Sequence, residues 1–293
     1  MKLVKSIFGL LLAGLVMQGC SDELEELNEN PNQPENVPTD VLMVAGTRAS
    51  MNSMVSESFL LANNVAQLSA KTLRTEVDVY NWNAFSTLWS AQYQALTDLV
   101  DAGNQAFDEG DNATLGASLV LQSWIFSTLT MAYGDIPYTD AVRSAETGNF
   151  TPAYQRQEEI LDGNDGILST LDSAITLLNN ANGSVNGDII YDGNAGQWVK
   201  LANGLRLRIL LHLSNKRDVS NDMAAVVSTS LMQKGDDAAL NYLGSFPNEF
   251  PLFPLKQGDF DAVVMSEASV DVMKSYNDPR LARYARPDNI NKL

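Results

Sequence analysis

The chain has 293 residues, a formal net charge of −17, and a hydrophobic fraction of 45%, which is enough for a folded core of one large domain or two small ones. So acidic a chain is a poor match for nucleic acid or for anionic lipid headgroups, because few cations are available to neutralise phosphates. The single cysteine, Cys20, excludes an intrachain disulfide, and the single histidine, His212, excludes a multi-histidine metal centre. We therefore expect neither a metal nor a cofactor.

The first residues have the layout of a secretory signal. Lys2 and Lys5 form a short basic region, and an uncharged apolar run from Ile7 to Met17 follows them. This run is too short to span a bilayer. The pattern predicts a signal peptide over residues 1–19.

The end of this signal, "MQGC", resembles a bacterial lipobox. Gly19 and Cys20 fit that pattern, whereas Met17 and Gln18 depart from it. The resemblance implies that Cys20 is lipidated and anchors the protein in a membrane, with more than one acyl chain for stable attachment. The alternative is an ordinary signal peptide with an incidental cysteine. The acids of "SDELEE" directly after Cys20 resemble the surface-export signal of Bacteroidetes lipoproteins.

Residues 20–40 are expected to form a tether. Three prolines disfavour helix and sheet there, while the asparagines and acids keep the segment solvated. Thr39 or Asp40 supplies an N-cap for a first helix over about 41–72.

Helical periodicity dominates the remaining chain. Apolar residues recur at three- and four-residue steps from Phe85 to Phe107, and a second apolar stretch ends at Gly134, which predicts an antiparallel helical hairpin. Strict alternation, the sign of a substantial sheet, is missing. Further helices are expected at 153–181, from about 198 to 213, near 221–234 and at 265–276. The fold class is mainly α, with hairpins of tetratricopeptide size and few or no strands.

Several motifs, in this order, resemble the SusD/RagB family of outer-membrane nutrient-binding lipoproteins. They are the lipobox with its acidic signal, "LNENPNQP", "NAFSTLWSAQYQALTDL", "YGDIPYTDAV", "WVKLANGLRLRILLHLSN" and "NDPRLARYARP". The resemblance implies tetratricopeptide-like hairpins carrying a loop-rich, ligand-binding half. It also implies a non-catalytic protein at the cell surface that captures a nutrient and passes it to a TonB-dependent (SusC-like) transporter of the outer membrane. The family usually runs past this length, so residues 41–293 are expected to be a SusD-like domain truncated at its carboxy terminus.

Sugar recognition without catalysis needs flat aromatic faces flanked by hydrogen-bonding side chains. Such residues are expected in loops, because aromatic residues on helix stripes are occupied in packing. On this reasoning seven aromatic residues belong to the core: Phe85, Trp89, Tyr93, Trp124, Phe126, Tyr133 and Trp198.

The stretch "VDVYNWNAF" is the leading candidate for a binding platform. Tyr80 and Trp82 alternate there with Asn81 and Asn83, so two rings lie beside two amides. The alternative is a helix entry, with Asn83 as the N-cap.

Loop aromatics supply the remaining candidates: Tyr191 lies in a turn-rich loop, and Phe246, Phe250 and Phe253 lie in a proline-rich one. Their alternative role is packing onto the helices. The motif "YGDIPYTDAV" is interpreted as structural, with Gly134 ending a helix and Pro137 fixing a turn. The run Asp162–Gly166 lacks the ligands of a calcium loop and is interpreted as a helix-entry turn.

Three functions remain open at this point. The first is an outer-membrane lipoprotein that binds an oligosaccharide, and the second is the same scaffold binding a peptide. The third is a secreted α-helical glycoside hydrolase, which would need two acids, one with a raised pKa. No acid stands in an apolar sequence setting that would raise its pKa, so we expect no enzyme.

Overall fold

The computed structural model describes residues 37–293, apart from 74, 82–85, 247, 256–261 and 286–293. The chain divides into two units, Met1–Pro38 and Thr39–Leu293, and the description below concerns the second. Cys20 and the expected signal and tether up to residue 36 lie outside the described residues. Helices make up most of the second unit, and its strands are short, so the expected fold class is confirmed.

The elements in chain order are α3 Thr39–Glu57, the π-helix η1 Ser58–Ala62, α4 Asn63–Val65, β1 Ser69–Lys71, α5 Ser86–Glu109, α6 Asn112–Tyr133, β2 Ile136–Pro137, α7 Ser144–Thr147, β3 Tyr154–Gln155, α8 Gln157–Asp162, α9 Ile167–Asn179, α10 Ala195–Leu213, α11 Ser220–Val227, β4 Val263–Met265, α13 Glu267–Ser275 and α14 Leu281–Tyr284.

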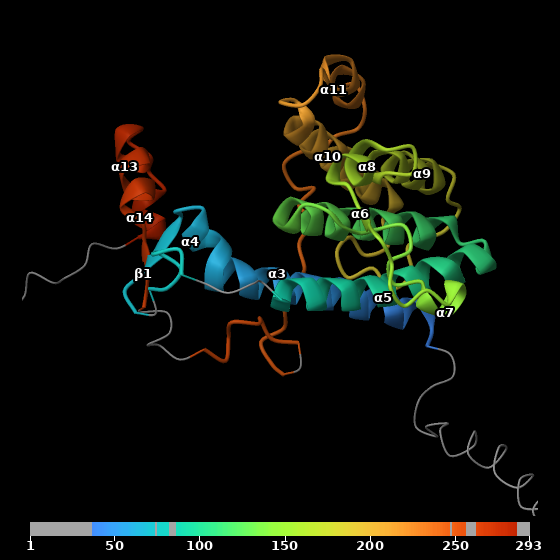
Figure 1. Ribbon diagram of the computed structural model, residues 1–293, viewed down its shortest axis with the longest axis horizontal. Coiled ribbons are helices and arrows are strands. Elements are labelled where there is room, and N and C mark those ends of the chain that lie inside the picture. The colour runs from blue at the N-terminus through green and yellow to red at the C-terminus, as the bar shows by residue number, and fades with distance from the viewer. Residues whose placement is uncertain (1–36, 74, 82–85, 247, 256–261, 286–293) are drawn as a thin grey trace, which may run out of the picture. The chain divides into compact units, whose positions relative to one another are not determined.

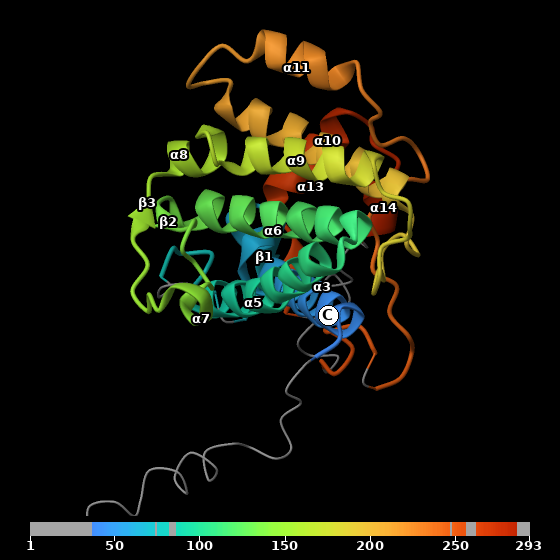
Figure 2. The same cartoon turned by 90° about the vertical axis from the view of Figure 1, so that its right-hand side faces the viewer.

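Successive helices pack against one another in layers. α3 lies against α5, α5 against α6, α6 against α9, and α9 against α10 (Figures 1 and 2). α5 and α6 form the expected antiparallel hairpin, joined by a turn at Gly110 and Asp111. The core lies between these layers, because each helix turns its apolar side toward the next one.

The middle helix, α6, is capped at both termini, and most of it is buried. Both oxygens of the Asp111 carboxylate cap its first turn: Oδ1 accepts from the backbone N–H groups of Ala113 and Thr114, and Oδ2 accepts from the Thr114 hydroxyl. Gly134, with φ of 79°, ends the helix. By length and composition α6 could cross a membrane, but 61% of its most apolar stretch is buried among the other helices, which is the position of a core helix.

Glycines let neighbouring helices approach closely at two points. A Cβ on Gly46 of α3 would lie 2.7 Å from Leu99 Cγ of α5, and a Cβ on Gly116 of α6 would lie 2.7 Å from Leu178 Cγ of α9. Beside the first contact, Ser50 Oγ and Gln92 Oε1 are 2.5 Å apart, and Gln92 Nε2 donates to the Ser50 carbonyl. Both side chains are buried, so this pair fixes how α3 and α5 face each other.

Three of the expected helices are shorter than predicted, among them the one near 221–234, which is α11 and ends at Val227. The first ends at Val65, because residues 69–71 pair antiparallel with β4 as strand β1 and so leave the helical path. The stretch 153–181 is divided into β3, α8 and α9. A Cβ on Gly163 would lie 2.5 Å from the Glu159 carbonyl oxygen, so this glycine permits the tight turn between α8 and α9.

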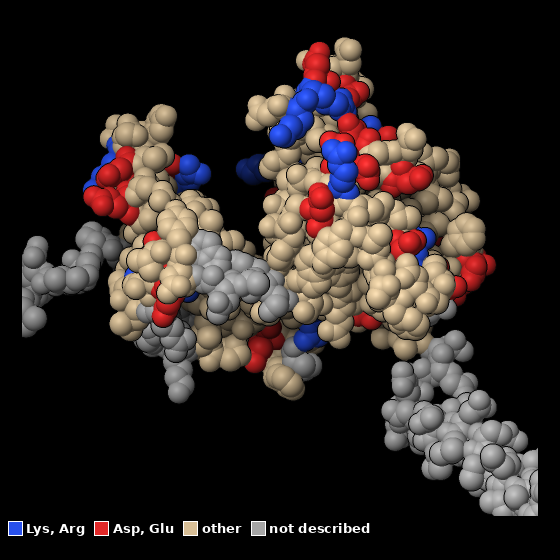
Figure 3. All heavy atoms as spheres, viewed as in Figure 1, with Lys and Arg blue, Asp and Glu red and all other residues tan. Residues whose placement is uncertain are grey.

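Charged side chains gather as ion pairs between helices. Arg217, just after α10, binds Asp162 of α8 and Asp222 of α11, each at 2.6 Å. Figure 3 shows basic and acidic side chains mixed over this group of helices. His212 lies exposed in the last turn of α10, as expected for a histidine at a helix C-terminus.

The glycine contacts make a direct prediction about stability. Gly46→Ala and Gly116→Ala each force a methyl group into a packed helix contact and should lower the free energy of unfolding by about 1–3 kcal/mol. Gly204→Ala is the matched control, because its nearest neighbour, Met232 Sδ, is 3.4 Å away. That change should be neutral or stabilising by up to about 1 kcal/mol. Urea denaturation measures all three, and equal effects at the three positions would contradict the packing argument.

Candidate ligand-binding surface

A row of aromatic rings runs from the surface into the helical layers. Tyr154 of β3 stacks on Trp89 of α5, with ring centroids 6.1 Å apart and planes 21° apart. Trp89 also meets Tyr133 of α6 edge to face at 5.1 Å, and Tyr93 lies 4.8 Å from it on the next turn of α5. Tyr154 is 66% exposed, so the row presents an open aromatic face to solvent.

The fold explains why these rings meet. Since α5 and α6 are antiparallel, the first turns of α5 lie beside the last turn of α6. β2 and β3 pair just beyond that point, with Pro137 opposite Tyr154. The Tyr93 hydroxyl donates to the Pro137 carbonyl oxygen at 2.7 Å, which ties the loop to α5.

The motif 133–142 builds the support for this row. Asp135 accepts from the backbone N–H of Gln157 at 2.9 Å, and the Gln157 amide donates to the Thr130 carbonyl at 2.6 Å. The Thr130 hydroxyl donates to the Gly134 carbonyl at 2.6 Å. These contacts agree with the structural role expected for the motif.

Burial sets the ionisation of the groups around the row. It raises the pKa of Tyr93, and Tyr154 adds to this effect. It also raises the pKa of Tyr133, although a hydrogen bond from the backbone N–H of Trp89 acts to lower it. Burial also raises the pKa of Glu57, at the end of α3, which acts electrostatically on Tyr133. The surface therefore offers neutral phenols and a carboxylate as hydrogen-bonding groups next to flat rings.

The stretch predicted as the binding platform precedes α5 in the sequence. Tyr80 is 72% exposed and has a left-handed backbone with φ of 57°, and the backbone N–H of Asn81 donates to the Glu76 carbonyl at 2.7 Å. Trp82 and Asn83 lie outside the described residues. A ligand contact by these four residues stays a prediction.

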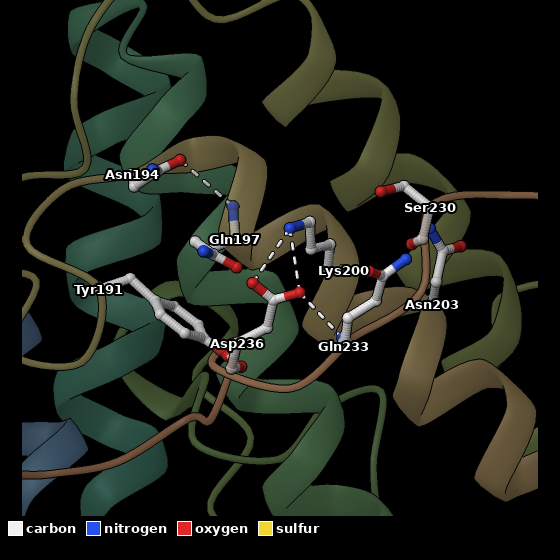
Figure 4. Close-up of polar contacts among 8 residues, drawn as sticks. All are labelled: Tyr191, Asn194, Gln197, Lys200, Asn203, Ser230, Gln233 and Asp236. Carbon is white, nitrogen blue, oxygen red and sulfur yellow. Dashed lines mark hydrogen bonds and ion pairs between the residues drawn. The ribbon is translucent and has the colours of Figure 1, made fainter.

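Tyr191 lies in a polar network that fastens a loop to α10 (Figure 4). Its hydroxyl donates to the Asp236 carbonyl at 3.2 Å, and its ring meets Trp198 edge to face at 5.5 Å. Asp188 accepts from the Trp198 indole N–H at 2.8 Å and from the Gly193 N–H at 2.9 Å. Tyr191 thus has a packing role, and a ligand contact by it stays a prediction.

The rest of this network holds the segment that follows α11. Lys200 points toward Asp236 in Figure 4, and its Nζ lies 3.0 and 3.1 Å from the two carboxylate oxygens. The backbone N–H of Gln233 donates to the same carboxylate at 2.9 Å, and this bond, with Lys200, lowers the pKa of Asp236. Asn203 donates to the Ser230 carbonyl at 3.1 Å.

The proline-rich loop carries the last three candidates. Phe246 is 85% exposed, while Phe250 is 42% exposed and meets Tyr242 edge to face at 5.3 Å. The Tyr242 hydroxyl donates to Asn52 of α3 at 2.7 Å, so this part of the loop lies over α3. Phe246 and Phe253, the latter 67% exposed, have largely open rings, and none of the three residues belongs to the aromatic row.

Sequence reasoning missed part of the row. Trp89, Tyr93 and Tyr133 were expected in the core but are only half-buried, and Tyr154 was not singled out. Their stripe positions lie at the ends of α5 and α6, where a helix face stops being covered by its neighbour.

The expectation that no acid has a raised pKa is also wrong, because burial raises the pKa of Glu57, Asp98 and Asp101.

Metal binding finds no support in the part of the chain that the structure describes, where no three histidine, cysteine or acidic side chains converge on a common point.

Tyr191 gives a testable pH dependence. Burial, and then Asp236 and Asp188, raise its pKa from 10.0 to about 12. The unfolded chain loses this proton near pH 10 and the folded chain keeps it to about pH 12, so unfolding releases a proton in this window and the free energy of unfolding falls as pH rises. In Tyr191→Phe that fall should be shallower, because only the other buried tyrosines remain.

At neutral pH the free energy of unfolding of the same variant should be lower by about 0.5–1.5 kcal/mol, because the hydrogen bond to Asp236 is lost. Urea denaturation from pH 7 to 12 measures both effects. A variant with the same slope as the unaltered protein would show that the Tyr191 hydroxyl is not buried as described.

Comparison with known proteins places the chain in a family. Residues 31–292 match a sequence family described as SusD-like, starch-binding and associating with the outer membrane. No curated protein matches the chain.

Solved structures share the fold. A SusD homologue of Bacteroides fragilis NCTC 9343 superposes with a TM-score of 0.67 at 25% identity, over 84% of this chain and 52% of that one. An outer-membrane protein of Bacteroides vulgatus ATCC 8482, whose description associates it with nutrient binding, gives 0.69 at 29%, over 84% and 52%. A chitin-binding protein gives 0.67 at 22%, over 84% and 54%.

The present chain thus spans about half the length of the structures that it matches. The family match begins within the expected tether and covers most of the chain from there, and the helical layers agree with it. The chain belongs to the SusD/RagB family of outer-membrane-associated, nutrient-binding proteins.

Proposed function

We propose that the protein is a lipid-anchored receptor on the outer face of the outer membrane that captures an oligosaccharide and delivers it to a TonB-dependent transporter. Membership in a family described as starch-binding and associating with the outer membrane supports the general role. The partner transporter rests on the family resemblance alone. Catalysis is not part of the proposal, since the family is one of binding proteins.

The aromatic row is the observation that carries the oligosaccharide. Sugar rings present C–H faces that pack on aromatic rings, with hydroxyls at their edges that need hydrogen-bonding partners. Tyr154 and Trp89 supply the flat surface, and Glu57 with the Tyr133 hydroxyl lies beside them. Tyr80 to Asn83 precede the same helix and would extend the surface. A structural relative described as chitin-binding supports a glycan as the ligand class.

Residues 1–40 supply the location in this proposal. The signal over 1–19 directs export, Cys20 carries the acyl chains, and the acids after it direct the protein to the cell surface. The proline-containing segment 20–40 would serve as the tether between the anchor and residues 41–293.

Binding to maltooligosaccharides and chitooligosaccharides tests the surface. Tyr154→Ala should weaken binding roughly tenfold, which corresponds to about 1.4 kcal/mol, because it removes the exposed ring without disturbing a buried one. Tyr80→Ala and Trp82→Ala should weaken it too. Isothermal titration calorimetry measures the affinities.

Phe107→Ala is the matched control, since Phe107 is 71% exposed on the same helix but roughly 27 Å from Trp89 along the axis. That variant should bind like the unaltered protein. Unchanged affinity in Tyr154→Ala, Tyr80→Ala and Trp82→Ala would contradict the surface. Saturable binding of peptides without binding of either glycan would favour the peptide alternative.

The anchor has its own prediction. Cys20→Ser should move the protein from the membrane fraction to the aqueous phase of a detergent partition, because no thiol remains to carry acyl chains. Immunoblots of the two phases measure this. A Cys20→Ser protein that still partitions with membranes would refute the lipid anchor and leave the glycan surface untouched.

A further inference from the structure

Phe126 lines a hollow that none of the rings of the aromatic row lines. It is a pocket of about 290 Å³ between α5, α6, the loop at 138–143 and the start of α9. This volume is near the lower limit of ligand pockets, roughly 300–1,000 Å³, so it suits one small molecule rather than an oligosaccharide. None of the residues predicted from the sequence as ligand contacts lines it.

The floor of the pocket is apolar apart from one unsatisfied hydroxyl. Val100, Leu119 and Phe126 contribute carbon surface, and Ser123 lies among them. Ser123 is only 2% exposed, and its Oγ has no hydrogen-bond partner. Buried hydroxyls in folded proteins are nearly always paired, so this one indicates a missing polar partner inside the pocket.

The mouth of the pocket carries one charge of each sign. Arg143 and Asp165 both line it, and neither side chain has a hydrogen bond or ion pair within the described residues. Burial raises the pKa of the Tyr138 hydroxyl between them, the hydrogen bond with Thr170 and the charge of Arg143 lower it, and the charge of Asp165 raises it. Elsewhere in the described helices, arginines such as Arg206 and Arg217 bind neighbouring carboxylates.

Gln122 also lines the pocket. The Gln122 amide uses its Nε2 on Ser118 Oγ at 2.9 Å and on the Leu99 carbonyl at 3.4 Å, which leaves Oε1 for another donor. The pocket therefore combines a cation, an anion, an amide oxygen and a hydroxyl around an apolar floor.

We propose that this pocket binds a free α-amino acid. The ligand carboxylate would meet the Arg143 guanidinium, the ligand ammonium would meet the Asp165 carboxylate, and the side chain would lie on the floor at Ser123. Charge-assisted hydrogen bonds of this kind are the strong ones, and a zwitterion satisfies both signs at once.

A sugar matches the pocket less well. Phe126 is only 5% exposed and its ring is covered edge to face by Tyr93 and Tyr138, so a pyranose cannot stack on it. A neutral hexose would also leave both mouth charges without a counter-charge. The Ser123 hydroxyl further favours a side chain with a hydrogen-bonding atom, so threonine should bind better than its near-isostere valine.

Titration calorimetry on the full-length protein with L-threonine, L-valine and D-glucose tests the proposal. We expect saturable binding of L-threonine, weaker binding of L-valine and none of D-glucose. Arg143→Gln and Asp165→Asn should each weaken L-threonine binding by roughly tenfold or more, because each removes a charge-assisted bond. Arg156→Gln and Glu158→Gln are the matched controls, since these two residues form an exposed pair away from the pocket, and both should leave binding unchanged.

Ser123→Ala separates binding from folding. The variant should have an equal or higher melting temperature, because it removes an unpaired buried hydroxyl, yet it should lose the preference for threonine over valine. Absence of saturable binding by either amino acid would overturn the proposal, as would binding that survives both mouth variants, or binding of D-glucose alone. Oligosaccharide affinity in Arg143→Gln should not change, so failure here is distinct from failure of the glycan surface.

Discussion

The close helix contacts at Gly46 and Gly116 are the constraint on which the rest of the structure depends. Without a side chain at these points, α3 packs directly on Leu99 of α5, and α6 packs directly on Leu178 of α9. The buried pair of Ser50 and Gln92 then fixes how α3 faces α5. Interiors packed at this density do not slide, so the ends of α5 and α6 are held in one arrangement.

Both sites follow from that arrangement. The N-terminal turns of α5 and the C-terminal turn of α6 bring Trp89 beside Tyr133, and the paired strands β2 and β3 place Tyr154 over them. On the inner side, Phe126 joins the row to the amino-acid pocket through Tyr93. Sites built on rigid helices keep their geometry better than sites built on loops alone.

Periodicity and capping chemistry were enough to predict the helices of the core. Gly134 ends α6 as expected, and the apolar steps of α5 gave its length. Strand β1 was not predictable, because its partner β4 lies far along the chain and long-range pairing overrides local helix preference. The burial of individual aromatic side chains was also not predictable. A position on an apolar stripe indicates the face of the helix but not whether another element covers that face. Tyr191 packs on Trp198, whereas Trp89 stacks with Tyr154, which is itself exposed.

Hydrogen exchange with bound oligosaccharide tests the central claim, that the joined ends of α5 and α6 with β3 form the ligand surface. Amide exchange would be followed by mass spectrometry with and without a maltooligosaccharide or chitooligosaccharide that binds. The account predicts slower exchange in residues 87–93 and 150–157, with little change in α10 and α11. Protection confined to α10, α11 or the loop at 242–250, with none at 87–93 and 150–157, would contradict it.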